Sequence, residues 1–293
     1  MNSYSSSKSF ASAPRSLEHL SDEKKDNDFP AAECICNVAS NEQVNDDYKL
    51  MILDVPTIAL KAQAGQFFQL LCSSADDHEL ATRRPMSIYE VDSTAEQIKF
   101  LYKCVGRGTQ SMAILKKHDS VNIAGPFGIG FSLEAEWKNV VVLGRGVGLA
   151  TLAPISQLAS EKGVGITALI SARSPHLLMS QELFEKIGAK IITVTDTDGS
   201  SSVENLEMLL EKLIEVDGID AFFTCGSTRL LNLTKKLGLK HGIPGQVALE
   251  QIMACGLGPC YICVRTFEVN GKQVLRRVCK DGPVFDIQEA VGW

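Results

Sequence analysis

Four cysteines near the C-terminus constrain the fold of this chain more than any other feature. Cys255, Cys260, Cys263 and Cys279 follow the spacing C-x4-C-x2-C-x15-C. Thiolate sulfur is a soft ligand that suits zinc or iron–sulfur clusters, and the triplet C-x4-C-x2-C is the plant-type [2Fe–2S] spacing. Structural zinc sites more often present two short cysteine pairs, whereas Cys279 has no pair mate. We therefore expect a [2Fe–2S] cluster on these residues, with zinc or unligated core cysteines as the alternatives.

A predicted β-hairpin explains how the fourth cysteine reaches the other three. The segments on either side of Asn270-Gly271 are strand-like, and Asn-Gly is the preferred pair for a type I′ turn. Counting back from this turn places Cys263 opposite Val278. Cys279 then lies beside Cys263 on the neighbouring strand, so one ligand cage can form despite the gap of 15 residues.

The composition is typical of a globular chain with more than one domain. The sequence has 293 residues, of which 45% are hydrophobic and 22% charged, with a net charge of −6. An acidic balance argues against nucleic-acid binding, and no apolar run is long enough to span a membrane. Nine cysteines without a secretory signal argue against a disulfide framework. We expect a cytoplasmic protein whose other five cysteines are small buried hydrophobic residues.

The hydrophobic pattern divides the chain into four parts. Residues 1–32 are rich in serine and charge and are predicted to be a disordered tail, with an organelle-targeting segment as the less favoured reading. Residues 33–133 hold short strands separated by turn residues, which indicates an antiparallel β-barrel with one helix over 110–117. Residues 134–243 alternate strands with helices, which predicts a doubly wound α/β domain. Residues 244–293 form the small cluster domain.

Two segments of the predicted barrel suit a flavin. The segment RPMS, residues 84–87, lies on a strand, where an arginine can grip a pyrophosphate and a serine can reach a flavin ring nitrogen. The segment GRGT, residues 106–109, is a Gly-rich turn into a helix, which can bind an anion. Each signal is weak alone, since Arg84 could form a surface ion pair and Thr109 could be an ordinary N-cap.

The α/β part contains candidate residues for a dinucleotide. Glycines follow its first strand and open a helix, although the fingerprint is imperfect; they are Gly144, Gly146 and Gly148. The second strand ends without an acid for a ribose hydroxyl, so Arg145 or Arg173 could meet a 2′-phosphate, and NAD and NADP both stay open. Further candidates lie at later strand ends; they are Asp196, Asp198 and Gly226. Alternatively, the glycines only allow close helix–sheet packing and the later residues form plain turns.

Taken together, these segments resemble the electron-transfer subunit of type B (NAD-linked) dihydroorotate dehydrogenase, in the ferredoxin reductase-like superfamily. The resemblance covers about 33–293 in the same order. Its most specific part is the C-terminal cysteine block. The segments that carry it are AGQFFQL (64–70), RRPMSI (83–88), GRGTQSM (106–112), GPFGIGF (125–131), TDTDGS (195–200), ALEQIMACGLGPCYICV (248–264) and RRVCKDGPVF (276–285).

The resemblance implies a flavin, a nicotinamide and a partner. FAD would be held by Arg84, Pro85, Met86, Ser87, Gly108 and Thr109, with Leu101, Tyr102 and Lys103 near the ring. NAD(P) would bind in the 140–226 region, at Gly144, Gly146, Gly148, Asp198 and Gly226. The partner would be an FMN-containing catalytic subunit that oxidises dihydroorotate in pyrimidine (UMP) biosynthesis, in a heterotetramer. Electrons would pass from FMN through the cluster to FAD and NAD⁺, and this chain would need no acid–base catalytic residue.

The chain departs from the family pattern around the nicotinamide site. Arg145 stands where the family usually shows glycine, Thr151 lies near a usual proline, and Ser227 replaces another proline. These departures leave the pyridine nucleotide open. Two alternatives therefore stand beside the first reading. One is a small FAD/[2Fe–2S] subunit of an NAD(P)H:ferredoxin or electron-bifurcating oxidoreductase, and the other is a zinc-stabilised interaction module.

Overall fold

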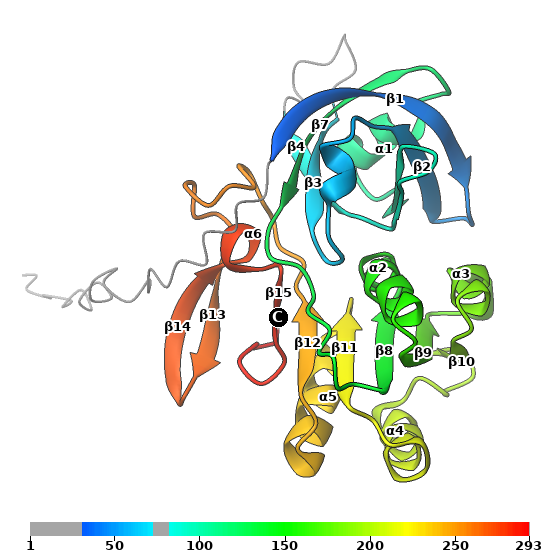
Figure 1. The fold of residues 1–293 in the computed structure, drawn as a ribbon, viewed down its shortest axis with the longest axis vertical. Coiled ribbons are helices and arrows are strands. Elements are labelled where there is room, and N and C mark those ends of the chain that lie inside the picture. The colour runs from blue at the N-terminus through cyan, green and yellow to red at the C-terminus, as the bar shows by residue number, and fades with distance from the viewer. Residues whose placement is uncertain (1–30, 73–81, 293) are drawn as a thin grey trace, which may run out of the picture.

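An antiparallel sheet forms the first part of the computed structural model, which describes residues 31–72 and 82–292 (Figure 1). Its strand order is β4-β3-β7-β1-β2-β6-β5. The edge strand β4 also contacts β6, so the sheet curls into an open barrel. Its strands are β1 (Ala32–Gln43), β2 (Tyr48–Asp54), β3 (Phe67–Leu71), β4 (Arg83–Ser87), β5 (Glu90–Asp92), β6 (Gln97–Lys103) and β7 (Ser120–Phe127).

The two faces of the barrel strands have different partners. Successive side chains of a strand point to opposite faces. On β3, Phe68 and Leu70 join the apolar core inside the barrel. Phe67 lies on the other face and packs with the C-terminal part of the chain. Gln69 shares the face of Phe67 and is also fully buried. Strand β3 therefore connects the barrel to the C-terminal segment.

Helix α1 (Arg107–Ala113) begins three residues before the helix predicted over 110–117 and ends before it. Gly106 is its N-cap residue. Thr109 is in the third helical position, where its hydroxyl accepts hydrogen bonds from the N–H groups of Val105 (3.0 Å) and Gly106 (3.2 Å). The alternative role of Thr109 as the N-cap is therefore wrong, because the side chain caps the helix from inside its first turn.

The second sheet has six strands in the order β10-β9-β8-β11-β12-β15. The first five are parallel and β15 is antiparallel to β12. The strands are β8 (Asn139–Arg145), β9 (Gly165–Ala172), β10 (Lys190–Thr195), β11 (Ala221–Cys225), β12 (Gly245–Ala248) and β15 (Val284–Asp286). The helices are α2 (Gly148–Glu161), α3 (Gln181–Lys186), α4 (Val203–Asp217) and α5 (Thr228–His241), and short 3₁₀ turns lie at Ala59–Lys61 and Pro175–Leu177.

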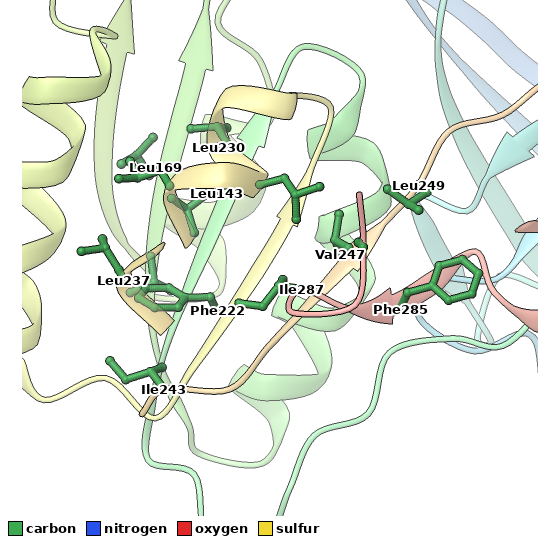
Figure 2. Packing of buried hydrophobic residues seen from close by; sticks show 14 of the residues in the cluster. Leu143, Leu169, Phe222, Leu230, Leu237, Ile243, Val247, Leu249, Phe285 and Ile287 are labelled. Carbon is green, nitrogen blue, oxygen red and sulfur yellow. The ribbon is translucent and has the colours of Figure 1, made fainter. Parts of the chain in front are cut away.

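Helices cover both faces of this sheet, which confirms the doubly wound prediction (Figure 1). Val140 and Val142 of β8 pack with residues of α2 and α3. The alternate residue Leu143 points to the opposite face and packs with α4 and α5. Figure 2 shows this second face, where Leu237 of α5 lies over Phe222 of β11. The continuous apolar strands are explained by burial on both sides.

The C-terminal segment forms a hairpin of β13 (Val264–Val269) and β14 (Lys272–Arg277), followed by the short helix α6 (Val278–Asp281). At the turn, Asn270 has φ 51° and Gly271 φ 73°, as a type I′ turn requires. Val269 pairs with Lys272, which confirms the predicted register.

Other parts of the C-terminal segment extend the α/β sheet. Strands β12 and β15 were not predicted, and both come from the stretch 244–293. The domain boundaries proposed from the sequence remain predictions. The predicted tail falls outside the described residues except for residues 31 and 32. Within the described ranges, none of the helices combines the length and apolarity needed to cross a bilayer.

Candidate functional site

The structure brings the four cysteines of the predicted cluster site together. The N–H of Val278 donates to the carbonyl oxygen of Cys263 at 3.1 Å. The N–H of Cys279 lies 3.4 Å from Cys263 Sγ. These contacts confirm that the hairpin carries Cys279 to Cys263.

Cys279 does not lie on the neighbouring strand as predicted, because the chain leaves β14 at Arg277 and enters α6. The Asp281 carboxylate accepts a hydrogen bond from the Arg277 N–H at 2.7 Å, and the Arg277 guanidinium pairs with the same carboxylate at 3.0 Å. This local pair closes a tight helical turn, and the turn points the Cys279 backbone N–H at the Cys263 sulfur.

The loop between Cys255 and Cys260 folds around the first sulfur. Gly256 has φ 71° and Gly258 φ 101°, a backbone region open mainly to glycine. The Leu257 N–H lies 3.4 Å from Cys255 Sγ. Burial opposes ionisation of Cys255, but hydrogen bonds from Cys260 and from the N–H groups of Leu257 and Gly258 outweigh it and lower its pKa to about 7. This sulfur is therefore readily available as a thiolate ligand.

The four sulfur atoms are crowded enough to affect one another. Burial raises the pKa of Cys279, and the nearby sulfurs of Cys263, Cys255 and Cys260 raise it further. Cys263 and Cys279 are each 1% exposed, so solvent does little to relieve the repulsion between thiolates at these positions. Positive metal centres would relieve it, and four thiolates form the donor set of a [2Fe–2S] cluster.

The spacing of the ligands bears on the zinc alternative. Zinc needs four ligands on one centre, whereas a [2Fe–2S] cluster divides four cysteines between two irons. The C-x4-C-x2-C-x15-C spacing, in which Cys279 has no pair mate, fits the cluster better than zinc.

A cavity of about 840 Å³ lies between the barrel, the α/β part and the cluster segment. Its volume suits a cofactor site. Of the predicted flavin residues, those on β4 and β6 line it: Arg84, Pro85, Met86, Ser87, Leu101, Tyr102 and Lys103. Gly108 adjoins it, since a β-carbon at Gly108 would lie 2.8 Å from Arg84 Nε. Thr109 does not line the cavity, because its hydroxyl caps α1.

Several lining residues were not predicted from the sequence. They are Phe67, Val105, Val147, Thr151, Leu249, Glu250, Gln251, Ile252, Met253, Ala254 and Ile262, together with Thr82, Arg83 and Pro283. Glu250 is an exposed residue on the cavity wall, and partial loss of solvent around its carboxylate raises its pKa. No local pattern marks Glu250, because it reaches the cavity only when the chain leaves β12 toward the barrel.

The predicted dinucleotide glycines lie close together at the carboxyl ends of β8 and β11. A β-carbon on Gly148 would meet the backbone of Cys225, and one on Gly226, which has φ 87°, would meet the Arg145 carbonyl oxygen. A β-carbon on Gly144 would lie 2.5 Å from the Leu149 side chain. These contacts agree with the packing alternative, and they also leave the strand ends free of bulky side chains.

The charged candidates of this region pair with one another. Arg145 holds Asp196 with two hydrogen bonds of 2.6 and 3.2 Å, and it also donates to the Ser171 hydroxyl at 2.9 Å. Hydrogen bonds from Arg145 and Ser201, with the charges of Arg145 and Arg229, lower the pKa of Asp196 to about 2. The Arg145 guanidinium is therefore already engaged by a carboxylate.

Asp198 belongs to a turn. Its carboxylate accepts hydrogen bonds from the Ser200 N–H at 2.9 Å and from the Ser200 hydroxyl at 2.5 Å. The plain-turn alternative explains these contacts. A role for Asp198 in nucleotide binding remains a prediction.

Comparisons with known proteins point to one family. Residues 250–291 match a model of the iron–sulfur cluster binding domain of dihydroorotate dehydrogenase B. The electron transfer subunit of dihydroorotate dehydrogenase B (NAD⁺) from Desulforamulus reducens is 30% identical over 242 residues, covering 82% of this chain and 91% of that protein. The subunit of the same name from Shouchella clausii is 29% identical over 257 residues, covering 87% and 96%.

Solved structures agree on the fold. The structure of an NADH-dependent reduced ferredoxin-NADP oxidoreductase, described in connection with flavin-based electron bifurcation, has a TM-score of 0.74 and 26% identity. The similarity covers 87% of this chain and 89% of that one. Ferredoxin-NADP⁺ reductase from Plasmodium falciparum has a TM-score of 0.56 at 11% identity, covering 71% and 90%, so it supports the fold alone.

Proposed function

The chain belongs to the family of dihydroorotate dehydrogenase B electron transfer subunits, and from this we propose that it passes electrons between an FMN-containing catalytic subunit and NAD, using a [2Fe–2S] cluster and FAD. Its redox role makes it a component of an oxidoreductase. Dihydroorotate would be oxidised in the partner, within pyrimidine (UMP) biosynthesis, in a heterotetramer of the two subunits.

One observation carries the proposal: the segment that lines the cavity also carries the cysteines. Residues 249–254 line the large cavity, and Cys255 follows directly. Ile262 also lines the cavity and precedes Cys263. A cofactor in the cavity and a cluster on the cysteines would thus be neighbours, as electron transfer between them requires.

We assign the following roles to the chain's own residues. Cys255, Cys260, Cys263 and Cys279 hold the cluster. Arg84, which lies against Gly108, holds the FAD pyrophosphate, and Ser87 orients the flavin ring. The apolar lining excludes water from the ring. When bound, FAD exchanges hydride with a nicotinamide and single electrons with the cluster.

The nicotinamide dinucleotide would bind at the carboxyl ends of β8 and β11, where ligands bind in such sheets. Gly144, Gly146, Gly148 and Gly226 leave these strand ends free of bulky side chains, which supports this location. The Arg145–Asp196 pair lies at the same edge of the sheet, so an incoming nucleotide would meet a neutralised carboxylate. We expect NAD to be the substrate, since the relatives are named for it.

Visible and EPR spectra of the anaerobically purified protein test the proposal. We expect flavin absorption together with a [2Fe–2S] signal that appears on reduction with NADH and more weakly with NADPH. Copurified with its partner, the protein should reduce NAD⁺ only when dihydroorotate is present. Colourless protein with one zinc per chain, or NAD⁺ reduction independent of dihydroorotate, would overturn the proposal.

The TM-score of 0.74 with the ferredoxin-NADP oxidoreductase structure favours a second candidate. In that case the chain would be a small FAD/[2Fe–2S] subunit of an NAD(P)H:ferredoxin or electron-bifurcating oxidoreductase. Reduction of ferredoxin by NADPH, measured on the complex isolated from its native cells, separates the two candidates. The first predicts no ferredoxin reduction.

A further inference from the structure

Gln69 of β3 carries a buried amide that has no partner. Its side chain is fully buried, and neither Oε1 nor Nε2 makes a hydrogen bond to any of the described residues. Buried polar groups in proteins are nearly always hydrogen-bonded, because losing water without a replacement partner is unfavourable. An orphaned amide of this kind therefore indicates a partner outside the polypeptide.

The amide faces the loop of the cluster cysteines. A β-carbon placed on Gly256 would lie 3.1 Å from Gln69 Nε2 and 3.0 Å from Gln69 Cγ. Gly256 directly follows Cys255, and its left-handed φ of 71° turns the loop back on the Cys255 sulfur. The absence of a side chain at Gly256 thus leaves room for the Gln69 amide against the ligand loop.

Strand geometry directs Gln69 to this place. Phe67 and Gln69 share the outward face of β3, and the Phe67 ring lines the large cavity. Gln69 pairs with Pro85 of β4, on which the proposed flavin residues lie. The same short strand therefore presents one side chain to the cavity and the next outward-facing one to the cysteine loop.

A second glutamine of the barrel shows that burial alone does not leave an amide unpaired. Gln66 is also fully buried. Its Oε1 accepts a hydrogen bond from the Gln63 N–H at 2.8 Å, and its Nε2 donates to the Gly128 carbonyl oxygen at 2.8 Å. The Gln66 amide is therefore satisfied within the polypeptide, whereas the Gln69 amide is not.

We infer that Gln69 donates a hydrogen bond from its Nε2 to a sulfur atom of the bound [2Fe–2S] cluster and so raises the reduction potential of the cluster. The inference rests on the proposed function, because it requires the cluster. Hydrogen bonds to the sulfurs set cluster potentials, and a donor favours the more negatively charged, reduced form. Gln69 is a positioning and tuning residue of the barrel that acts on a cofactor of another segment.

The test compares Gln69→Met with Gln66→Met in the anaerobically purified holoprotein. Both changes replace a buried amide with an apolar side chain of similar length. We expect Gln69→Met to lower the cluster potential in an EPR-monitored redox titration by a tenfold change in the reduced-to-oxidised ratio, about 59 mV for a one-electron couple. Gln66→Met should keep the potential of the unaltered protein, although it loses two internal hydrogen bonds.

A second measurement detects the hydrogen bond from Gln69 to the cluster directly. In protein carrying ¹⁵N in its glutamine side chains, pulsed EPR of the reduced cluster should show a nitrogen coupling that disappears in Gln69→Met. If Gln69→Met loses its cofactors, Gln69→Leu removes the donor without adding a charge and carries the same expectation for potential and coupling.

An unchanged potential and an unchanged nitrogen coupling in either variant would overturn the role of Gln69. The proposed function would survive that result, because the cluster signal would still be present. Absence of a [2Fe–2S] signal from the unaltered protein would instead overturn the proposed function itself. The two failures are therefore distinct.

Discussion

Cys279 is the residue on which the proposed cluster depends most, since it alone comes from beyond the hairpin. We expect Cys279→Ser to disrupt the cluster and block electron flow between FAD and the partner, because a serine oxygen is a harder ligand than thiolate. Reduction of a dye by NADH through FAD should largely survive. EPR and paired activity assays measure both effects. Cys34→Ser, which changes a half-buried cysteine of β1, is the control and should leave the EPR signal unchanged.

Equal loss of both activities in Cys279→Ser would contradict this expectation. It would show that the cluster supports the fold of the whole subunit rather than only its electron transfer.

Asp196 provides a pH test at the same scale. Its pKa falls from 3.8 to about 2 in the folded protein, chiefly through the hydrogen bond from Arg145. The folded state thus favours the carboxylate, so the stabilisation is complete above about pH 4 and is lost as pH falls toward 2. Both partners are partly exposed, so we expect Asp196→Asn to cost about 1 kcal/mol or less at pH 7.

Urea unfolding of the unaltered protein and of Asp196→Asn at pH 7, 5 and 3 measures the difference in their free energies of unfolding. It should be equal at pH 7 and 5 and smaller at pH 3. If the difference in the free energy of unfolding grew on acidification, the Asp196 carboxylate would not stabilise the folded protein as we expect.

At the scale of elements, the β13–β14 hairpin brings Cys279 close to Cys263, and its turn can be tested with a matched pair of substitutions. Gly271 in the turn and Gly163 after α2 both have φ 73° with open space around the position of a β-carbon. Alanine at either place should cost about 1–2 kcal/mol, because L-residues disfavour left-handed backbone. Only Gly271→Ala should speed the loss of iron to a chelator, followed by the visible spectrum.

Equal rates of iron loss in Gly271→Ala and Gly163→Ala would argue against this role. In that case the hairpin would not control the approach of Cys279 to Cys263.

At the scale of the whole molecule, the large cavity joins parts of the chain that are far apart in sequence. FAD bound there should stabilise the assembled protein, by about 2.7 kcal/mol at a hundredfold excess over Kd. Adding FAD to flavin-depleted protein should therefore raise Tm. We expect Arg84→Ala to weaken this rise. Lys99→Ala is the control, because Lys99 pairs with Glu90 outside the cavity. In this variant FAD should raise Tm as much as in the unaltered protein.

A Tm that does not respond to FAD would contradict this assignment. An equal response in Arg84→Ala and in the unaltered protein would show that Arg84 does not bind FAD.

Local patterns in the sequence determined much of this protein. The Asn270-Gly271 turn predicted the register that brings Cys263 to Val278, because a hairpin register depends on residues near one another in the chain. Short strands separated by turn residues predicted the barrel, and continuous apolar strands alternating with helices predicted the doubly wound sheet, because a strand buried on both faces is apolar throughout.

Only the tertiary structure decided the rest. Strands β12 and β15 are four and three residues long, too short for a periodic signal, and they form because the edge of the α/β sheet offers them a partner. The cavity is lined by several segments that are far apart in the sequence, so no single segment reveals Glu250 or Phe67 as part of it. The unpaired amide of Gln69 likewise depends on how β3 packs against the cysteine loop. Contacts between residues far apart in the chain leave no mark on either local sequence.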